Sequence, residues 1–124
     1  MKIGTATGFE YNVEAGREKY IEQTGEIWKI SAAGKEGKNT FYAGENEIFK
    51  IRSRRKGDRF YPVGMTGSKS VSNLFTDKKI PVYKRDSVPI LTAGDIIVNI
   101  GGKFRDRRFL ENNGNRILYK LEIK

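Results

Sequence analysis

The sequence contains neither cysteine nor histidine among its 124 residues. These two absences exclude disulfide bridges, thiolate zinc sites, cysteine and histidine nucleophiles, and an imidazole general base. Long apolar runs are also missing, and the N-terminus lacks the basic-then-apolar pattern of a signal peptide. We therefore expect a soluble, cytoplasmic protein without a membrane anchor, to which few enzyme mechanisms are open.

The length and the aromatic content predict one domain with a single core, spanning residues 1–124. Hydrophobic residues make up 37% of the chain, which has 7 Phe, 6 Tyr and 1 Trp. Most of these aromatic residues fall at inward positions of the predicted strands and helix. Tyr61 and Tyr83 are exceptions, because each lies beside basic residues at the end of an element, where its ring could stack on an exposed base.

Positive charge is concentrated in the second part of the chain. Residues 1–48 carry 6 Lys and Arg against 8 Asp and Glu, a net charge of −2, whereas residues 49–124 carry 18 against 7, a net charge of +11. Charge segregated in this way attracts polyanions such as nucleic acids. The alternative is that these residues only form the solvated face of a basic protein.

The densest basic cluster spans residues 50–59, with six bases against one acid, Asp58. In the strand that opens this cluster, period-2 alternation places Lys50, Arg52 and Arg54 together on the outer face. In the following turn we expect Asp58 to bond neighbouring amides or to pair with Arg59. Residues 103–108 form a second basic cluster, either an RNA-contacting loop or a solvated one.

The segment 67–70, Gly-Ser-Lys-Ser, opens a predicted helix that ends by Lys79. Hydroxyls, backbone N–H groups and an ammonium at a helix start can hold a phosphate, but an ordinary N-cap explains the serines equally well. The spacing is not that of a nucleotide-binding P-loop. A second short helix is predicted from Pro81 to Arg85.

The remaining pattern predicts strands. Period-2 alternation and glycine turns indicate strands at residues 9–14, 20–24, 26–31, 39–43, 47–53, 90–93, 96–100 and 116–124. The predicted fold class is therefore α+β, with two short helices inserted between strands. The acids Asp77, Asp86, Asp95 and Asp106 stand singly beside bases, so we expect most of them to form surface ion pairs and none of them to form a metal site.

An ordered series of short motifs resembles one known family. The series is Ile51 to Phe60 containing GDRF, Pro62-Val63-Gly64-Met65, Gly67-Ser68-Lys69, Leu74-Phe75, Asp77-Lys78-Lys79-Ile80-Pro81, Lys84-Arg85-Asp86, Val88-Pro89-Ile90-Leu91, Ile97-Val98 and Gly101. Together these motifs resemble the C-terminal domain of bacterial tRNA(Ile)-lysidine synthetase, most strongly over residues 48–102.

This resemblance implies a C-terminal, tRNA-binding portion of a longer ligase. The implied fold is of the PheT/TilS type, related to the tRNA synthetase β-subunit: a small β-sandwich or barrel-like mixed sheet with two short helices packed on it. The whole enzyme would use ATP and magnesium to attach lysine to the wobble cytidine of tRNA(Ile). The family's Ser-Gly-Gly-x-Asp-Ser nucleotide loop is absent from this sequence. The segment itself is therefore expected to be non-catalytic and without a cofactor, with tRNA(Ile), chiefly its acceptor stem, and the catalytic domain of the same enzyme as partners.

We expect ten bases to contact RNA: Arg52, Arg54, Arg55, Lys56, Arg59, Lys69, Lys78, Lys79, Lys84 and Arg85. Two alternatives stay open. The domain could be a docking module that contacts its own catalytic part and binds RNA only in the assembled protein. A free-standing phosphate-ester enzyme using Lys69 and Asp58 is the other, and it lacks a base or metal cluster.

Overall fold

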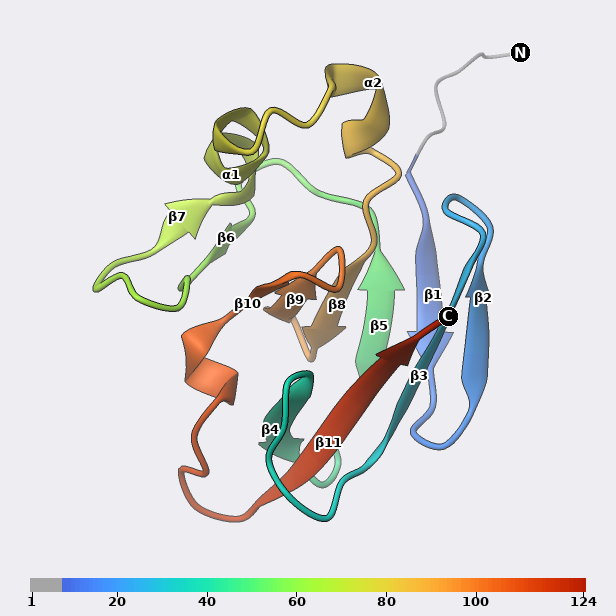
Figure 1. Cartoon of the computed structure of the whole chain (residues 1–124), viewed down its shortest axis with the longest axis vertical. Coiled ribbons are helices and arrows are strands. Elements are labelled where there is room, and N and C mark those ends of the chain that lie inside the picture. The colour runs from blue at the N-terminus through green and yellow to red at the C-terminus, as the bar shows by residue number, and fades with distance from the viewer. Residues whose placement is uncertain (1–7) are drawn as a thin grey trace.

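The computed structural model describes residues 8–124, which form two antiparallel sheets facing each other and a small helical layer at one end (Figure 1). The first sheet has the strand order β1-β5-β8-β9-β10, with bounds Glu10–Val13, Phe49–Arg52, Ile90–Ala93, Ile96–Ile100 and Phe104–Arg105. The second has the order β2-β3-β11-β4, with bounds Glu18–Ile21, Glu26–Ala32, Arg116–Ile123 and Thr40–Gly44.

The helical layer lies between β5 and β8 in the sequence. It consists of the short ribbon β6 and β7, the helices α1 and α2, and their loops, while a 3-10 turn, η1, follows β10. Their bounds are Arg59–Phe60, Lys69–Ser70, Val71–Asp77, Val82–Arg85 and Arg107–Phe109. Among residues 8–124, none of the helices has the length and apolar character needed to cross a membrane.

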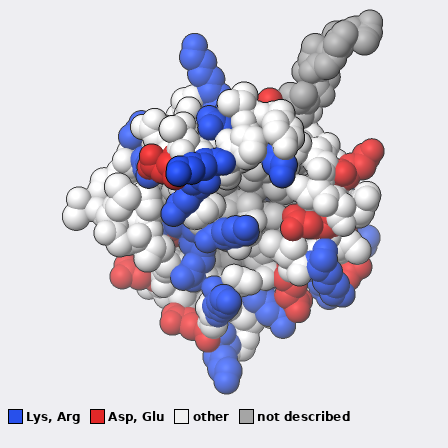
Figure 2. Space-filling model, turned by 45° about the horizontal axis from the view of Figure 1, so that its top comes forward, with Lys and Arg blue, Asp and Glu red and all other residues white. Residues whose placement is uncertain are grey.

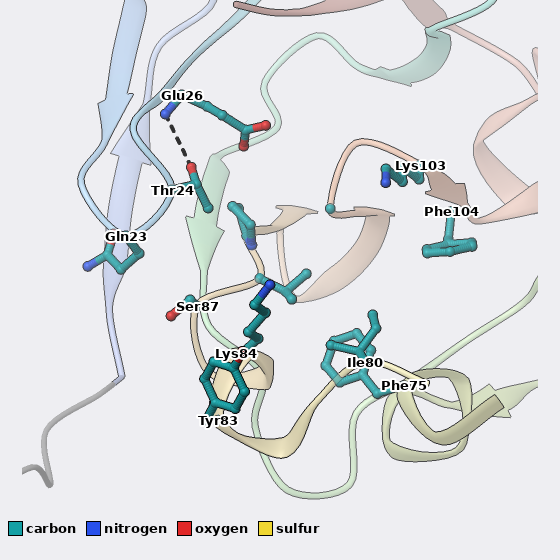
Figure 3. A pocket seen from close by; sticks show the side chains of 13 residues that line it. Gln23, Thr24, Glu26, Phe75, Ile80, Tyr83, Lys84, Ser87, Lys103 and Phe104 are labelled. Carbon is teal, nitrogen blue, oxygen red and sulfur yellow. Dashed lines mark hydrogen bonds between the residues drawn. The ribbon is translucent and has the colours of Figure 1, made fainter. Parts of the chain in front are cut away.

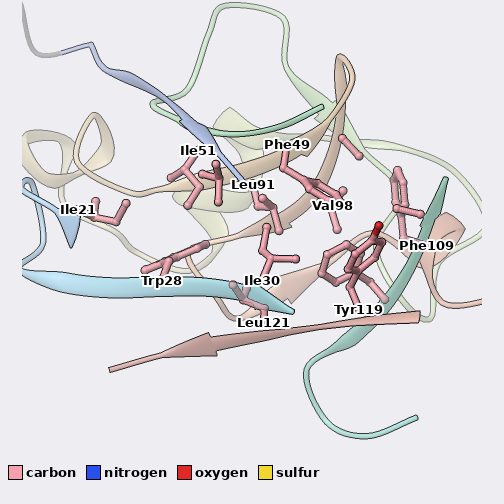
Figure 4. Close-up of a cluster of buried hydrophobic side chains, with 14 residues drawn as sticks. Ile21, Trp28, Ile30, Phe49, Ile51, Leu91, Val98, Phe109, Tyr119 and Leu121 are labelled. Atoms are coloured by element: carbon pink, nitrogen blue, oxygen red, sulfur yellow. The ribbon is translucent and has the colours of Figure 1, made fainter. Parts of the chain in front are cut away.

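The main core fills the space between the two sheets (Figure 4). Trp28 and Ile30 from one sheet meet Ile51 and Leu91 from the other, and all four are fully buried. At one end of this core the ring of Tyr119 lies 5.7 Å from that of Phe41 and 5.1 Å from that of Phe49. Edge-on and offset aromatic contacts at these distances add to the stability gained by burial.

A second core attaches the helical layer to the outer face of the first sheet. Val71, Leu74 and Phe75 of α1 are buried with Phe60 and with apolar residues of β8 and β9. The i, i+3, i+4 spacing places the three helix residues on one face. This packing fixes the position of the basic segment between β5 and α1.

The strand-rich fold was predicted from the sequence, but two expectations about the strands are wrong. The predicted mixed sheet is wrong, because every ladder between the described strands is antiparallel. The predicted strand at 20–24 is misplaced, because β2 ends at Ile21, whose carbonyl accepts bonds from the amides of Thr24 and Gly25 at 3.2 and 2.8 Å. The local turn overrides the strand pattern there.

Candidate nucleic-acid interface

Arg52 and Asp58 form a buried ion pair at the start of the basic segment. Arg52 Nη1 and Nη2 donate to the two Asp58 carboxylate oxygens at 2.9 and 3.0 Å, and the side chains are only 7% and 11% exposed. Arg52 does lie on the outer face of β5, but the following loop covers it. Its guanidinium is therefore engaged by Asp58 and little exposed, and its contact with RNA stays a prediction.

Asp58 also organises the turn that carries the exposed bases. Its carboxylate accepts from the Arg55 amide at 2.7 Å, and its own amide donates to the Arg55 carbonyl at 3.1 Å. Gly57 adopts φ 85°, which a glycine accommodates without steric cost. The expected amide bonding is thus present, whereas the expected Asp58–Arg59 pair is replaced by Arg59 Nε donating to Ser68 Oγ at 2.9 Å.

This turn borders an open, polar hollow of about 430 Å³. Its lining residues are Arg54, Arg55, Lys56, Gly57, Asp58, Arg59, Ser70, Val71, Ser72 and Asp86. Arg54 Nε donates to Asp86 at 2.9 Å and is partly covered, while Arg55, Lys56 and Arg59 are exposed. Because Asp58 is neutralised by Arg52, the hollow presents an excess of positive charge to solvent.

Ser70 is the N-cap of α1. Ser70 Oγ accepts from the Asn73 amide at 3.0 Å, and Lys69 forms an ion pair with Asp77. Between the phosphate and N-cap explanations of this segment, the contacts present are those of the N-cap. Lys69 is consequently turned along α1 and is only partly exposed.

The other predicted bases lie around the C-terminal end of α1 and on α2. Lys78, Lys79 and Lys84 are exposed, and Lys78 Nζ lies 5.5 Å from the centre of the Phe104 ring. Arg85 differs from them, because its Nε donates to the Ile80 carbonyl at 2.8 Å and so holds α2 in place. Figure 2 shows basic side chains gathered in a band across the face that carries the helical layer, with most acidic side chains in that view nearer its margins.

Asp106 does not form the surface ion pair that was expected of most of these acids. It is fully buried, and its carboxylate accepts from the Tyr61 amide at 2.9 Å and from Arg108 Nε and Nη2 at 3.0 and 2.8 Å. This hydrogen bond and ion pair hold the pKa of Arg108 above its ordinary value. The segment 103–108 is therefore anchored to Tyr61, which directly follows β6, through a contact across 45 positions of sequence.

The sequence reading also missed that Tyr61 is enclosed by two arginines. The guanidinium carbons of Arg108 and Arg107 lie 4.2 and 5.1 Å from the centre of its ring. Arg107 in addition donates to the carbonyls of Met65 and Thr66 at 3.0 and 2.7 Å. The ring of Tyr61 thus packs against these two arginines. In the sequence, only the density of bases at residues 103–108 indicated these partners.

The fold and this face define a class of protein: a small basic β-sandwich domain with a helical layer and a face rich in basic side chains. Residues 49–122 match the family model described as the TilS substrate C-terminal domain. The chain belongs to this family, as the motif series predicted.

Sequence relatives agree with this membership. The chain is 42% identical over 74 residues to the tRNA(Ile)-lysidine synthase of Symbiobacterium thermophilum, a match covering 60% of this chain and 15% of that protein. It is 35% identical over 99 residues to the synthase of Bacillus licheniformis, covering 72% and 21%. The matched part is thus about a fifth or less of the length of these relatives.

A solved structure has the same fold. The crystal structure of a TilS C-terminal domain matches with a TM-score of 0.77 and 21% sequence identity, covering 94% of this chain and 96% of that one. At this identity the likeness concerns the fold, which includes residues 8–48 that carry no recognised motif.

Proposed function

We propose that this chain is the C-terminal, tRNA-binding domain of a tRNA(Ile)-lysidine synthase. It would hold tRNA(Ile) while the catalytic part of the same enzyme attaches lysine to the wobble cytidine in an ATP-dependent reaction. Family membership supports this role, and so do the names of the relatives. The substrate is a cytoplasmic RNA, so we place the protein in the cytoplasm.

The observation that carries the proposal is the rigid basic turn at the polar hollow. The buried Arg52–Asp58 pair fixes the backbone, and Arg55, Lys56 and Arg59 project from that fixed turn to solvent. Bases held in place lose less conformational entropy when they meet phosphates. An A-form stem is recognised through its shape, phosphates and 2′-hydroxyls, so this surface suits a stem, and we propose the acceptor stem.

The residues present do not fit the ATP and magnesium that the whole enzyme would use. Within residues 8–124 there is no group of three or more acidic, His or Cys residues that could hold a metal ion. The sequence also lacks the family's nucleotide loop. We therefore assign this domain a binding and positioning role, which governs rate because small misplacements of reacting groups are costly.

Binding across a salt series tests the proposal. The 124-residue chain should bind a tRNA acceptor-stem hairpin with an affinity that falls steeply as salt rises, because each phosphate contact releases counterions. An affinity independent of salt would contradict it. In a full-length synthase, deleting this domain should raise the KM for tRNA while ATP binding is retained.

The alternative function is a module that docks only on its own catalytic part. It predicts different results in the same experiments. A truncated synthase would then lose ATP binding or dissociate, and the isolated chain would not bind RNA. The same two measurements therefore separate the two functions.

A further inference from the structure

A second cavity borders the helical layer (Figure 3), and it shares no lining residue with the hollow at the basic turn. Its volume is about 480 Å³, within the range of about 300–1,000 Å³ that is typical of sites for small ligands. Three parts of the chain line it: the β2–β3 turn, α1 and α2 with the loops that follow them, and the β9–β10 turn. The lining residues are Gln23, Thr24, Glu26, Phe75, Ile80, Tyr83, Lys84, Ser87, Val88, Pro89, Gly101, Lys103 and Phe104.

The floor of this cavity is apolar and held in place. The Ile80 amide donates to the Phe75 carbonyl at 2.9 Å, and the Gly101 amide donates to the Pro89 carbonyl at 2.7 Å. At Gly101, which has φ 66°, an added Cβ would lie 3.3 Å from Val88 Cγ1. A side chain there would be strained and would crowd the cavity wall, so glycine keeps the space open.

One large aromatic ring at the rim is exposed. Tyr83 is 79% exposed, although a tyrosine in a small domain normally buries most of its ring. Lys84 Nζ lies 5.9 Å from the centre of that ring, and Figure 3 shows the two side chains together on one side of the cavity. An exposed aromatic face beside an ammonium is the arrangement on which single-stranded nucleic acid bases stack.

The cavity is lined by two basic side chains and one acidic side chain, which come from different segments. The exposed bases Lys84 and Lys103 stand on the side of α2 and of the β9–β10 turn. Glu26 lies at the start of β3, where its carboxylate accepts from Trp28 Nε1 at 3.2 Å. A phosphate is attracted to the lysines and repelled by Glu26, so an entering nucleotide would place its phosphate at the lysines and its base on the ring of Tyr83.

We propose that this cavity takes one unstacked base from single-stranded RNA next to the bound stem, with Tyr83 as the stacking platform and Lys84 and Lys103 on the adjoining phosphate. The inference rests on the proposed function and adds a site separate from the basic turn. Stem phosphates bind the turn, and a single-stranded nucleotide binds the cavity.

The test compares three RNA probes that share one hairpin stem. One is blunt, one carries a 3′ overhang of four adenosines, and one carries an overhang of four abasic units, which supplies the same phosphates without bases. Stacking of one base contributes enough to tighten binding roughly tenfold. The unmodified chain should therefore bind the adenosine overhang about tenfold more tightly than the abasic one.

Substitutions on α2 test whether Tyr83 is the residue on which the base stacks. Tyr83→Ala should abolish the difference between the two overhangs, while Tyr83→Phe, which keeps the ring, should retain it. Val82→Ala is the matched control, because Val82 is 70% exposed on the same helix but does not line the cavity, and it should also retain the difference.

The outcomes that contradict the two proposals are distinct. Equal affinity for the two overhangs, or a preference that survives in Tyr83→Ala, overturns the base site while leaving stem binding in place. A blunt stem that does not bind at any salt concentration overturns the proposed function itself.

Discussion

The guanidinium of Arg52 and the carboxylate of Asp58 meet through two parallel hydrogen bonds beneath the basic turn. Such a bidentate pair fixes direction as well as distance. It therefore determines where the backbone of residues 55–58 runs, and the exposed bases of that turn depend on a pair that is hidden from solvent.

Replacing Asp58 with alanine should destabilise the domain by about 3–5 kcal/mol, because Arg52 would remain buried without its partner. Urea unfolding followed by the fluorescence of Trp28, which is fully buried, measures the change. Asp77→Ala is the control, since Asp77 pairs with Lys69 at the surface and should cost less than about 1 kcal/mol. Equal effects of the two substitutions would contradict a stabilising role for the buried pair.

Replacing Phe75 with alanine should cost about 3–5 kcal/mol of unfolding free energy, because its side chain is fully buried between α1 and the first sheet. Val82→Ala on the neighbouring helix should change stability by less than about 0.5 kcal/mol, since Val82 is exposed. A mild effect of Phe75→Ala would mean that the helical layer contributes little to the fold.

Replacing Arg54 or Arg55 with alanine should weaken binding to the RNA stem with little loss of stability. If each contacts one phosphate, the slope of log affinity against log salt should fall by about 1. Lys38→Ala removes one positive charge from the exposed β3–β4 loop and should leave both the affinity and the slope unchanged. If Arg55→Ala unfolded the domain instead, its side chain would be structural.

The pH dependence of stability should show a contribution from Glu10. Its hydrogen bond from Lys50, reinforced by the charges of Lys50 and Arg55, holds the pKa of Glu10 below its ordinary value of 4.5. A carboxylate whose pKa is lowered on folding stabilises the protein above its unfolded pKa, and this contribution is lost as pH falls from 4.5 through the folded value.

Unfolding midpoints measured across this acidic range should therefore decline less steeply in Glu10→Gln than in the unmodified chain. The difference should shrink at about 1 M salt, where exposed ion pairs are screened. Identical acid profiles of the two proteins would show that Glu10 contributes nothing.

The elements predicted correctly from the sequence depend on neighbours in the chain. The hairpin of β8 and β9 follows from a Gly-Asp turn between two apolar runs, and the cap of α1 follows from Ser70 placed just before its apolar stripe. Period-2 alternation also predicted a strand at residues 116–124, where β11 runs from Arg116 to Ile123. In each case a few adjacent residues determine the geometry.

The errors concern residues whose environment comes from distant segments. Alternation assigns Arg52 to the outer face, but it cannot show that a loop covers that face. Asp106 has bases near it on both sides in the sequence, yet it is buried. Its carboxylate accepts hydrogen bonds from the amide of the distant Tyr61 and from the guanidinium of Arg108. The cavity beside Tyr83 was not predicted, because its walls come from three separate parts of the chain.

The position of β11 has a consequence for the order in which the domain assembles on the ribosome. This last strand lies between β3 and β4, and β4 pairs with no other strand among residues 8–124. The nascent chain can therefore form the first sheet and the helical layer, but the second sheet must wait until residues 116–123 have emerged from the exit tunnel. Until then Phe41 and Ala43 have no strand to hold them over the core, so a chain halted before β11 would expose an incomplete apolar face and invite aggregation or degradation.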